Sequence, residues 1–109
     1  MNKYIDIESI KTAEPFKSLF PISPSILSAI TESIIHAGYD VSKPIVIWDE
    51  TDILLDGHTR LEASKQAGFD SIPACRVPFA SEDEAFDYAV RQQRDRRNLT
   101  DADILRLVQ

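Results

Sequence analysis

Apolar and polar positions along the chain follow two different periods, which predicts both helices and strands. Between Ser25 and Ala37 the apolar residues recur every three or four positions, as in a helix with one buried face. Ser23 or Ser25 is placed to cap this stretch, and Gly38 is placed to end it. The pattern predicts an amphipathic helix over residues 25–37.

Short β-branched or apolar runs bounded by turn residues predict four strands. The runs are Tyr4–Ile10, Pro44–Trp48, Ile53–Leu55 and Ile72–Val77. We expect the first at an edge of the sheet, followed by an irregular connection through three prolines, and the second and third as a hairpin. Pro73 and Pro78 predict that the last strand lies at an edge or starts late.

Helical periodicity returns twice more. One helix is expected from His58 or Thr59 to Gly68, and another after Ser81, which forms a capping-box pattern with Glu84. Thr100 is placed to cap a last helix. Strands and helices in this order predict a small α+β domain, with a mixed sheet and packed helices.

Composition places this domain among folded, globular proteins. The chain has 109 residues, of which 43% are hydrophobic and 28% charged, and no apolar run approaches the roughly 20 residues of a membrane-spanning helix. Without a signal-peptide pattern at the N-terminus we expect a cytoplasmic protein. The single cysteine, Cys75, permits no internal disulfide and is expected to be a small core residue.

Charge argues against duplex DNA binding by this domain alone. The net charge is −6, whereas affinity for DNA depends largely on cations that contact phosphates. A local basic strip from Arg91 to Arg97 interrupts the acidic sequence, and such strips are often solvated surface. The helical pattern also stops abruptly at Gln109, so we expect residues 100–109 to begin a truncated C-terminal helical region.

The residues Asp56-Gly57-His58-Thr59-Arg60 stand where a strand pattern changes to a helix pattern. The first turn of a helix offers backbone N–H groups and a positive dipole end, which bind phosphate readily. Gly57 permits a sharp turn and close approach, and Arg60 can donate two hydrogen bonds to an anion. Simpler roles stay open: Arg60 could pair with Asp56 or Glu62 at the surface, and Asp56 or His58 could cap the helix.

Three segments together resemble the N-terminal domain of ParB-like chromosome-partitioning proteins, whose fold is shared with sulfiredoxin. They are the helix with Gly38 and the following Pro44-Ile45-Val46-Ile47, the stretch from Leu55 to Ala63 with Gly68 and Ile72-Pro73-Ala74 behind it, and Gln92 to Thr100. Residues 39–43 lengthen the connection between glycine and proline found in many members. The resemblance covers the chain from about Ile5 to Gln109.

This resemblance implies a nucleotide pocket in residues 1–99. Relatives bind CTP (ParB) or ATP (sulfiredoxin), and Mg²⁺ would accompany the triphosphate. Matching positions imply contacts to phosphate from Gly57, His58, Thr59, Arg60, Arg94, Arg96 and Arg97, with Gly38, Pro44 and Ile45 on the side of the base. It further implies a larger bacterial protein of chromosome or plasmid partition, or another DNA-binding regulator. Such a protein would bind DNA through its C-terminal region and self-associate when nucleotide binds.

The chain departs from the family at the positions that would carry chemistry. Gln92 and Gln93 stand where relatives commonly have the Glu-Asn pair that serves metal binding and hydrolysis, and an amide is no carboxylate base. Sulfiredoxin needs a cysteine where this chain has His58, so sulfinic acid reduction is not expected. The resemblance and its departures together predict binding more than reaction.

Two other classes of function stay open. A ParB-like nuclease or an ATP-dependent phosphotransferase would need carboxylates, and the acidic residues near the loop are Asp49, Glu50, Asp52 and Asp56. The first three are typical of a hairpin turn, which leaves Asp56 as a weak catalytic candidate. The other class is a protein-interaction domain whose pocket has decayed. His36, His58 and Cys75 lack the short spacing of a metal site.

Overall fold

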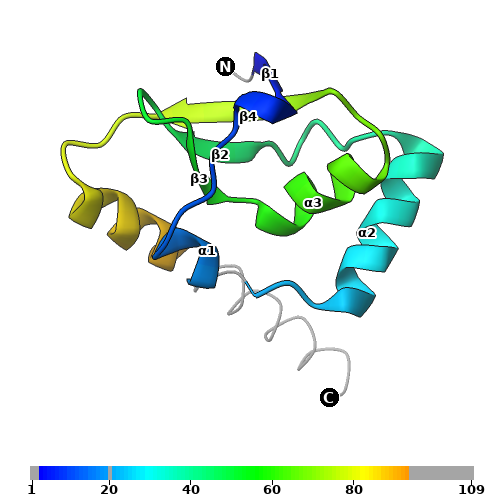
Figure 1. Ribbon diagram of the computed structural model, residues 1–109, viewed down its shortest axis with the longest axis horizontal. Helices are drawn as coiled ribbons and strands as arrows, with labels where there is room; N and C mark the ends of the chain where they lie inside the picture. Colours follow the sequence, from blue (N-terminus) through cyan, green and yellow to red (C-terminus); the bar gives the residue numbers. More distant parts are fainter. Residues whose placement is uncertain (1–2, 20, 94–109) are drawn as a thin grey trace.

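The computed structural model describes residues 3–19 and 21–93, which form a four-stranded sheet with helices packed on it (Figure 1). The strands are β1 (Lys3–Asp6), β2 (Ile45–Trp48), β3 (Ile53–Asp56) and β4 (Ser71–Val77). They lie in the order β1-β4-β2-β3, with β2 parallel to β4 and the other neighbours antiparallel. The predicted α+β fold with a mixed sheet is confirmed, as is the hairpin of β2 and β3.

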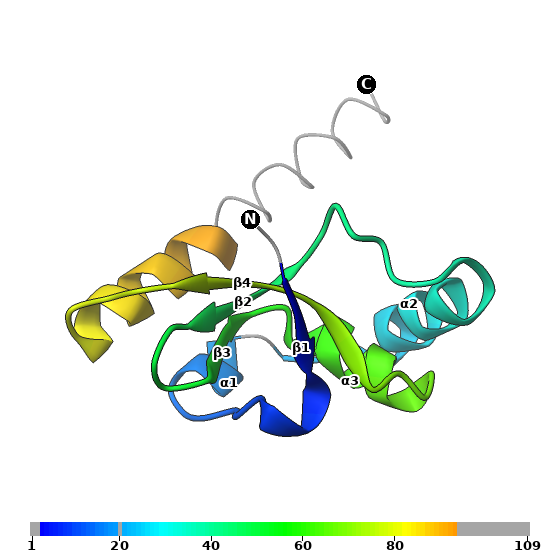
Figure 2. The same cartoon turned by 90° about the horizontal axis from the view of Figure 1, so that it is seen from above.

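The described helices are α1 (Phe16–Leu19), α2 (Pro24–Ala37), α3 (His58–Gln66) and a helix that includes residues 82–93, and a single 3₁₀ turn covers Ile7–Ser9. Ser23 occupies the N-cap of α2 and Gly38 its C-cap, as the sequence predicts. The end of α2 packs against α3, while α3 and the helix over 82–93 cover opposite faces of the sheet (Figure 2). None of the described helices is both long and apolar enough to cross a bilayer.

The first strand and the connection after it differ from the sequence-based prediction. β1 ends at Asp6, whose side chain accepts a hydrogen bond from the Glu8 N–H at 3.2 Å and starts the 3₁₀ turn. This turn directs Ile7 into the core, so the strand does not continue to Ile10. The connection expected to be irregular contains α1, and its Phe16 is fully buried.

The expected position of the last strand is wrong, because β4 lies inside the sheet between β1 and β2. Tyr4 of β1 stands opposite Pro73 of β4. The Ile7 N–H donates a hydrogen bond to the Asp70 oxygen, and in an antiparallel ladder hydrogen-bonded pairs alternate with non-hydrogen-bonded pairs. Counting back from Ile7 and Asp70, Tyr4 and Pro73 form a non-hydrogen-bonded pair. Pairing with β2 begins one residue later, at Ala74. The missing N–H of Pro73 therefore removes no hydrogen bond from either ladder.

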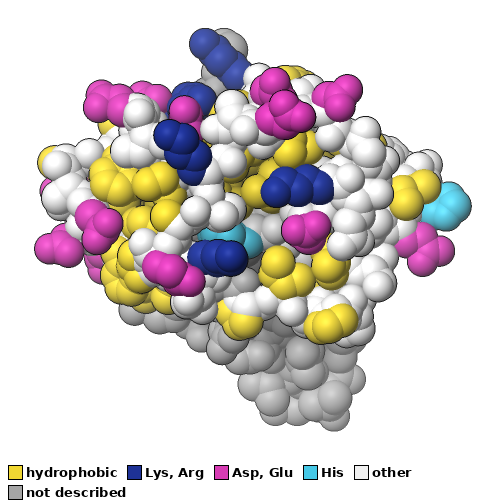
Figure 3. Space-filling view, in the orientation of Figure 1, with side chains coloured by type: hydrophobic (Ala, Val, Ile, Leu, Met, Phe, Trp, Pro, Cys, Tyr) yellow, Lys and Arg dark blue, Asp and Glu magenta, His cyan; other side chains and the backbone are white. Residues whose placement is uncertain are grey.

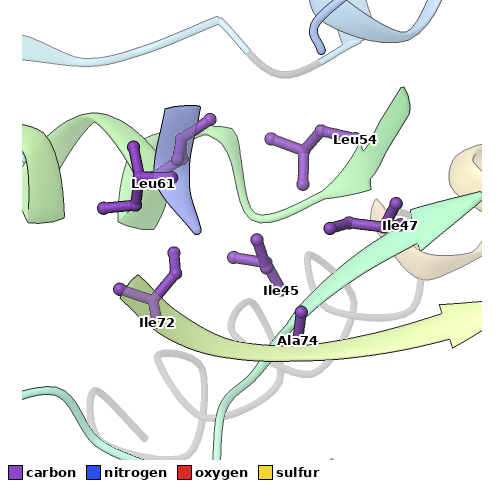
Figure 4. Close-up of a cluster of buried hydrophobic side chains, with 7 residues drawn as sticks. Ile45, Ile47, Leu54, Leu61, Ile72 and Ala74 are labelled. Atoms are coloured by element: carbon purple, nitrogen blue, oxygen red, sulfur yellow. The ribbon is translucent and has the colours of Figure 1, made fainter. Parts of the chain in front are cut away.

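Two hydrophobic clusters lie on the two sides of the sheet. The first joins α3 to the sheet and consists of Ile7, Ile45, Ile47, Leu54, Leu61, Ile72 and Ala74 (Figure 4). The second joins α1 and the helix over 82–93 to the β2-β3 hairpin and is built on Phe16, Leu55, Ala85 and Ala89. Phe16 stands 6.3 Å from Trp48 and 6.2 Å from Phe86, measured between ring centroids. Cys75 is a free, half-buried thiol on β4.

Candidate functional site at the start of α3

The junction of β3 and α3 brings the backbone of the predicted phosphate loop against the core. Asp56 ends β3, and Gly57 occupies the N-cap of α3 with a φ of 105°, a left-handed conformation that favours glycine. A Cβ atom at Gly57 would lie 2.6 Å from the Cγ2 atom of Ile45. This position therefore requires glycine for its dihedral angle and for its space.

The first turn of α3 presents its backbone donors. Gly57 takes the cap position in place of the expected Asp56 or His58, and it has no side chain to cap the helix. The first hydrogen bond within the helix runs from the Leu61 N–H to the Gly57 oxygen at 2.9 Å. The N–H groups of Thr59 and Arg60 make no hydrogen bond to another described residue. They are available, with the positive end of the helix dipole, for an anionic ligand.

Arg60 lines a cavity of about 230 Å³ that opens between α2 and α3. We call it the Arg60 cavity; its lining is Ala29, Ile30, Ser33, Ile34, Gly38, Asp40, Lys43 and Arg60. Within the described part of the chain the guanidinium makes no ion pair, so the surface pair with Asp56 or Glu62 is not formed. Arg60 and Gly38, predicted on the phosphate and base sides of a nucleotide, thus share one cavity with a second cation, Lys43.

Hydrogen bonds hold residues 39–43, which contribute Asp40 and Lys43 to the lining of this cavity. The Tyr39 hydroxyl donates to the Lys43 oxygen at 2.7 Å, and burial raises the pKa of Tyr39 to about 12. Asp40 Oδ1 accepts hydrogen bonds from the N–H and hydroxyl of Ser42 at 3.0 and 2.6 Å. These bonds hold the pKa of Asp40 below its ordinary value, with a smaller contribution from Lys43 and Arg60. The lengthened connection is thus an ordered element.

The other two predicted base-side residues do not line this cavity. Ile45 is fully buried in the first core cluster, directly beneath Gly57, and Pro44 is half-buried just before it. The side chain of Ile45 therefore positions the loop and is not exposed to a ligand.

His58 lies on the other side of α3 from Arg60, because residues two apart in a helix point about 200° from each other. It lines a larger cavity of about 490 Å³, which we call the His58 cavity (Figure 3). The lining residues are Thr12, Glu14, Lys17, Ser18, Pro21, Ile22, His58, Leu61, Glu62 and Lys65. The structure therefore brings the backbone of the pentapeptide together but directs the side chains of His58 and Arg60 to different cavities.

His58 is a neutral imidazole at pH 7. Only 5% of the residue is exposed, and this burial lowers its pKa to about 4. The charge of Asp56 opposes that effect, Lys17 adds to it, and Glu14 opposes it weakly. At neutral pH the His58 side chain therefore carries no positive charge.

Asp56, the last residue of β3, lies near the helix over 82–93. Asp56 is 6% exposed, and after burial its charge is the next contribution that raises the pKa of Tyr88. Gln92 lies one helical turn beyond Tyr88 on the same face, and Gln93 follows it; both are half-buried. The Oε1 atom of Gln93 has no hydrogen-bond partner among the described residues. An amide-bearing helix therefore approaches the carboxylate before the loop.

The acidic residues considered for a nuclease do not form one cluster. Arg76 pairs with Asp49 at 3.6 Å and with Asp52 at 2.8 Å, at the hairpin turn. Asp56 lies at the opposite end of β3, about four residues or 13 Å from Asp52. Residues 3–19 and 21–93 contain no group of three His, Cys, Asp or Glu residues placed to hold a metal ion.

The remaining predicted cations, Arg94, Arg96 and Arg97, lie outside the described residues, as does Thr100. The structure adds Lys43 at the Arg60 cavity and Lys17 and Lys65 at the His58 cavity. Lys43 had a signal in the sequence, since it belongs to the lengthened connection. Lys17 had none, because it lies in the stretch expected to be irregular.

Comparison with solved structures identifies the fold. A Pnob8-like ParB-N domain superposes with a TM-score of 0.67 and 26% identity, over 82% of this chain and 34% of that one. The C-terminally truncated ParB of Caulobacter crescentus in complex with CTP-γ-S gives a TM-score of 0.73 and 15% identity, over 85% and 52%. Sulfiredoxin from Arabidopsis thaliana gives a TM-score of 0.63 and 17% identity, over 83% and 97%.

The chain thus spans about a third of the Pnob8-like chain and about half of the truncated Caulobacter chain, but it matches nearly all of the sulfiredoxin chain. No family model matches the sequence, and no curated protein matches it. The neighbours and this chain share a fold that here consists of the four-stranded mixed sheet with its packed helices. This chain therefore has the ParB/sulfiredoxin-like fold.

Proposed function

We propose that this domain binds a nucleoside triphosphate, CTP or ATP, and holds its phosphates at the start of α3. The observation that carries the proposal is the first turn of α3, which has no side-chain cap, with Gly57 pressed against Ile45 and Arg60 in the same turn. Backbone donors, a helix dipole and an arginine are the groups that recognise phosphate oxygens. The nucleotide analogue in the Caulobacter ParB structure of the same fold supports this choice of ligand.

The two ends of the ligand would meet different parts of the site. The Arg60 cavity, at about 230 Å³, is smaller than the roughly 300–1,000 Å³ pockets that enclose whole small molecules, so it suits one part of a nucleotide. Its lining combines the apolar Ala29, Ile30 and Ile34 with the charged Asp40, Lys43 and Arg60. We assign this cavity to the base side and the α3 turn to the phosphates.

The residues at the expected metal positions do not fit a hydrolytic site. Gln92 and Gln93 supply amides, which neither accept a proton from water nor bind Mg²⁺ as a carboxylate does. We therefore propose binding without efficient hydrolysis, with Mg²⁺ carried by the triphosphate. Arg94, Arg96 and Arg97 are proposed as further phosphate contacts on the basis of the family resemblance.

In a longer protein this module would act as a nucleotide-dependent switch. We propose that bound nucleotide positions the segment after residue 93 and so controls DNA binding or self-association in a partition protein or regulator. The ParB neighbours, which are two to three times longer than the matched segment, support that placement.

Isothermal titration calorimetry with CTP, ATP and GTP, each with and without Mg²⁺, tests the binding. Heat and saturation are expected for at least one nucleotide, and their absence for all three at millimolar concentration would refute the proposal. Arg60→Ala should weaken binding at least tenfold, because a charge-assisted pair contributes roughly 1.5–3 kcal/mol. Arg76→Ala is the matched control: it removes the arginine of β4 that pairs with the hairpin turn, and it should leave affinity unchanged.

Nuclease and phosphotransferase activities are separate alternatives with their own assays. Supercoiled and single-stranded DNA incubated with Mg²⁺ or Mn²⁺ should stay intact, since Asp49 and Asp52 are paired with Arg76 and Asp56 is distant from them. Cleavage that disappears in Asp56→Asn would favour the nuclease instead. Transfer of labelled γ-phosphate to serine or protein would favour the phosphotransferase.

A further inference from the structure

His58 joins the proposed phosphate site to the His58 cavity. Its backbone belongs to the first turn of α3, where the phosphates would bind, while its side chain lines the cavity between that helix and residues 12–18 and 21–22. The residue is 5% exposed, so its imidazole is shielded from bulk water. A change of charge at the first turn therefore acts on a group that water screens poorly.

Groups of both signs face this imidazole from three elements. Asp56 approaches from β3, Glu14 and Lys17 from the segment that forms α1, and Glu62 and Lys65 from α3 itself. Glu14 is also held by α1, since its Oε1 atom accepts hydrogen bonds from the N–H and hydroxyl of Ser18. Burial outweighs the acidic neighbours, and the pKa of His58 falls to about 4. The positive end of the α3 dipole further disfavours an imidazolium here.

A bound triphosphate would reverse this balance. It brings several negative charges to the first turn of α3. One helical turn is about 5.4 Å long, and charges act over roughly 10 Å at 0.1 M salt, so the phosphate charges would reach a side chain of the same turn. A nearby anion favours the charged form of a base and compensates the helix dipole. On the basis of the proposed function, we propose that a phosphate ligand bound at α3 favours the protonated form of His58, so that binding is coupled to proton uptake from solvent and acidification strengthens binding.

This step is a protonation only. The imidazole becomes an imidazolium, the buffer supplies the proton, and no covalent bond to the ligand forms or breaks. Nucleotide affinity would then rise as the pH falls through about 5 towards 4.

Proton NMR on the 109-residue chain tests the proposal directly, because the sequence has two histidines. The imidazole resonances of His58 and His36 are followed from pH 4 to pH 8, with and without saturating CTP or ATP. The titration midpoint of His58 should rise by at least one pH unit with ligand. The midpoint of His36 should stay in place, since its side chain is 75% exposed on α2 and lies outside both cavities.

Calorimetry at pH 4.5 and 7.5 gives a second readout. A terminal phosphate itself titrates near pH 6, so the wild type is compared with His58→Gln, which removes only the contribution of the protein. With a midpoint that moves from about 4 to about 5, the gain in affinity between pH 7.5 and pH 4.5 should be about threefold larger in the wild type than in the variant. His36→Gln should behave like the wild type.

The outcomes separate the two proposals. Saturable nucleotide binding with an unmoved His58 midpoint would overturn the proton uptake and leave nucleotide binding intact. A failure of every nucleotide to bind would overturn both.

Discussion

At the scale of single residues, both the backbone dihedral angle and the core packing require glycine at position 57. Gly57→Ala would combine the cost of a left-handed alanine with the overlap against Ile45, about 2–4 kcal/mol in all. Gly68→Ala is the matched control, because Gly68 has a φ of 84° but no atom within 4 Å of an added Cβ, so only about 1–2 kcal/mol is expected. Urea unfolding measures both, and equal losses would contradict the packing argument.

His58 predicts how stability depends on pH in the free protein. Its folded pKa of about 4 lies below the ordinary 6.5, so the unfolded chain binds more protons between these values. The stability that neutral His58 contributes is complete above pH 6.5 and is lost as the pH falls towards 4. The loss is about 2 kcal/mol at pH 5 and about 3 kcal/mol in full.

Urea unfolding at pH 7 and pH 5 checks this dependence. His58→Gln should reduce the difference between the two pH values by about 2 kcal/mol, whereas His36→Gln, at an exposed site, should not. A wild-type difference that His58→Gln leaves unchanged would assign the acid sensitivity to other groups.

At the scale of elements, the one-turn helix α1 packs between the β2-β3 hairpin and the helix over 82–93. Phe16 is fully buried between Trp48 and Phe86. Phe16→Ala should therefore cost about 3–5 kcal/mol, and Phe16→Leu less than about 1.5 kcal/mol. Thermal or urea unfolding measures the loss. Tyr4→Ala, at a residue 65% exposed on β1, should change stability by no more than about 0.5 kcal/mol.

The sequence rules for helices correctly predicted α2 and α3, whereas the rule for prolines in strands misplaced β4. Periodicity and end signals located α2 and α3 because a helix buries one local stripe and needs local caps. The proline rule misplaced β4, because the cost of Pro73 depends on the direction in which its N would point in the ladder. That direction follows from pairing with a strand about 70 residues earlier in the chain.

At the scale of the whole molecule, ligand binding should stabilise the fold without consuming the ligand. At a nucleotide concentration of 100 times its Kd, linkage adds about 2.7 kcal/mol to the free energy of unfolding. This should raise Tm by roughly 10 °C for a domain near this size. Differential scanning fluorimetry measures the rise, and Arg60→Ala should reduce it while Arg76→Ala retains it.

Phosphate release provides the complementary measurement. Under the same saturating conditions it should stay at the background rate over hours, because Gln92 and Gln93 replace the acid pair. Release well above background that is lost in Arg60→Ala would show that hydrolysis uses groups other than these positions.

The sequence by itself determined the α+β class, most of the helices and the glycine turn before α3, since these depend on local period, caps and glycine. The family resemblance implied that Gly38 and Arg60 belong to one site, and both line the Arg60 cavity. Only the tertiary structure decided that His58 and Arg60 face different cavities, that Ile45 lies beneath Gly57, and that Lys43 joins Arg60. The physical reason is that burial, charge neighbours and ladder direction arise from contacts between segments far apart in the chain.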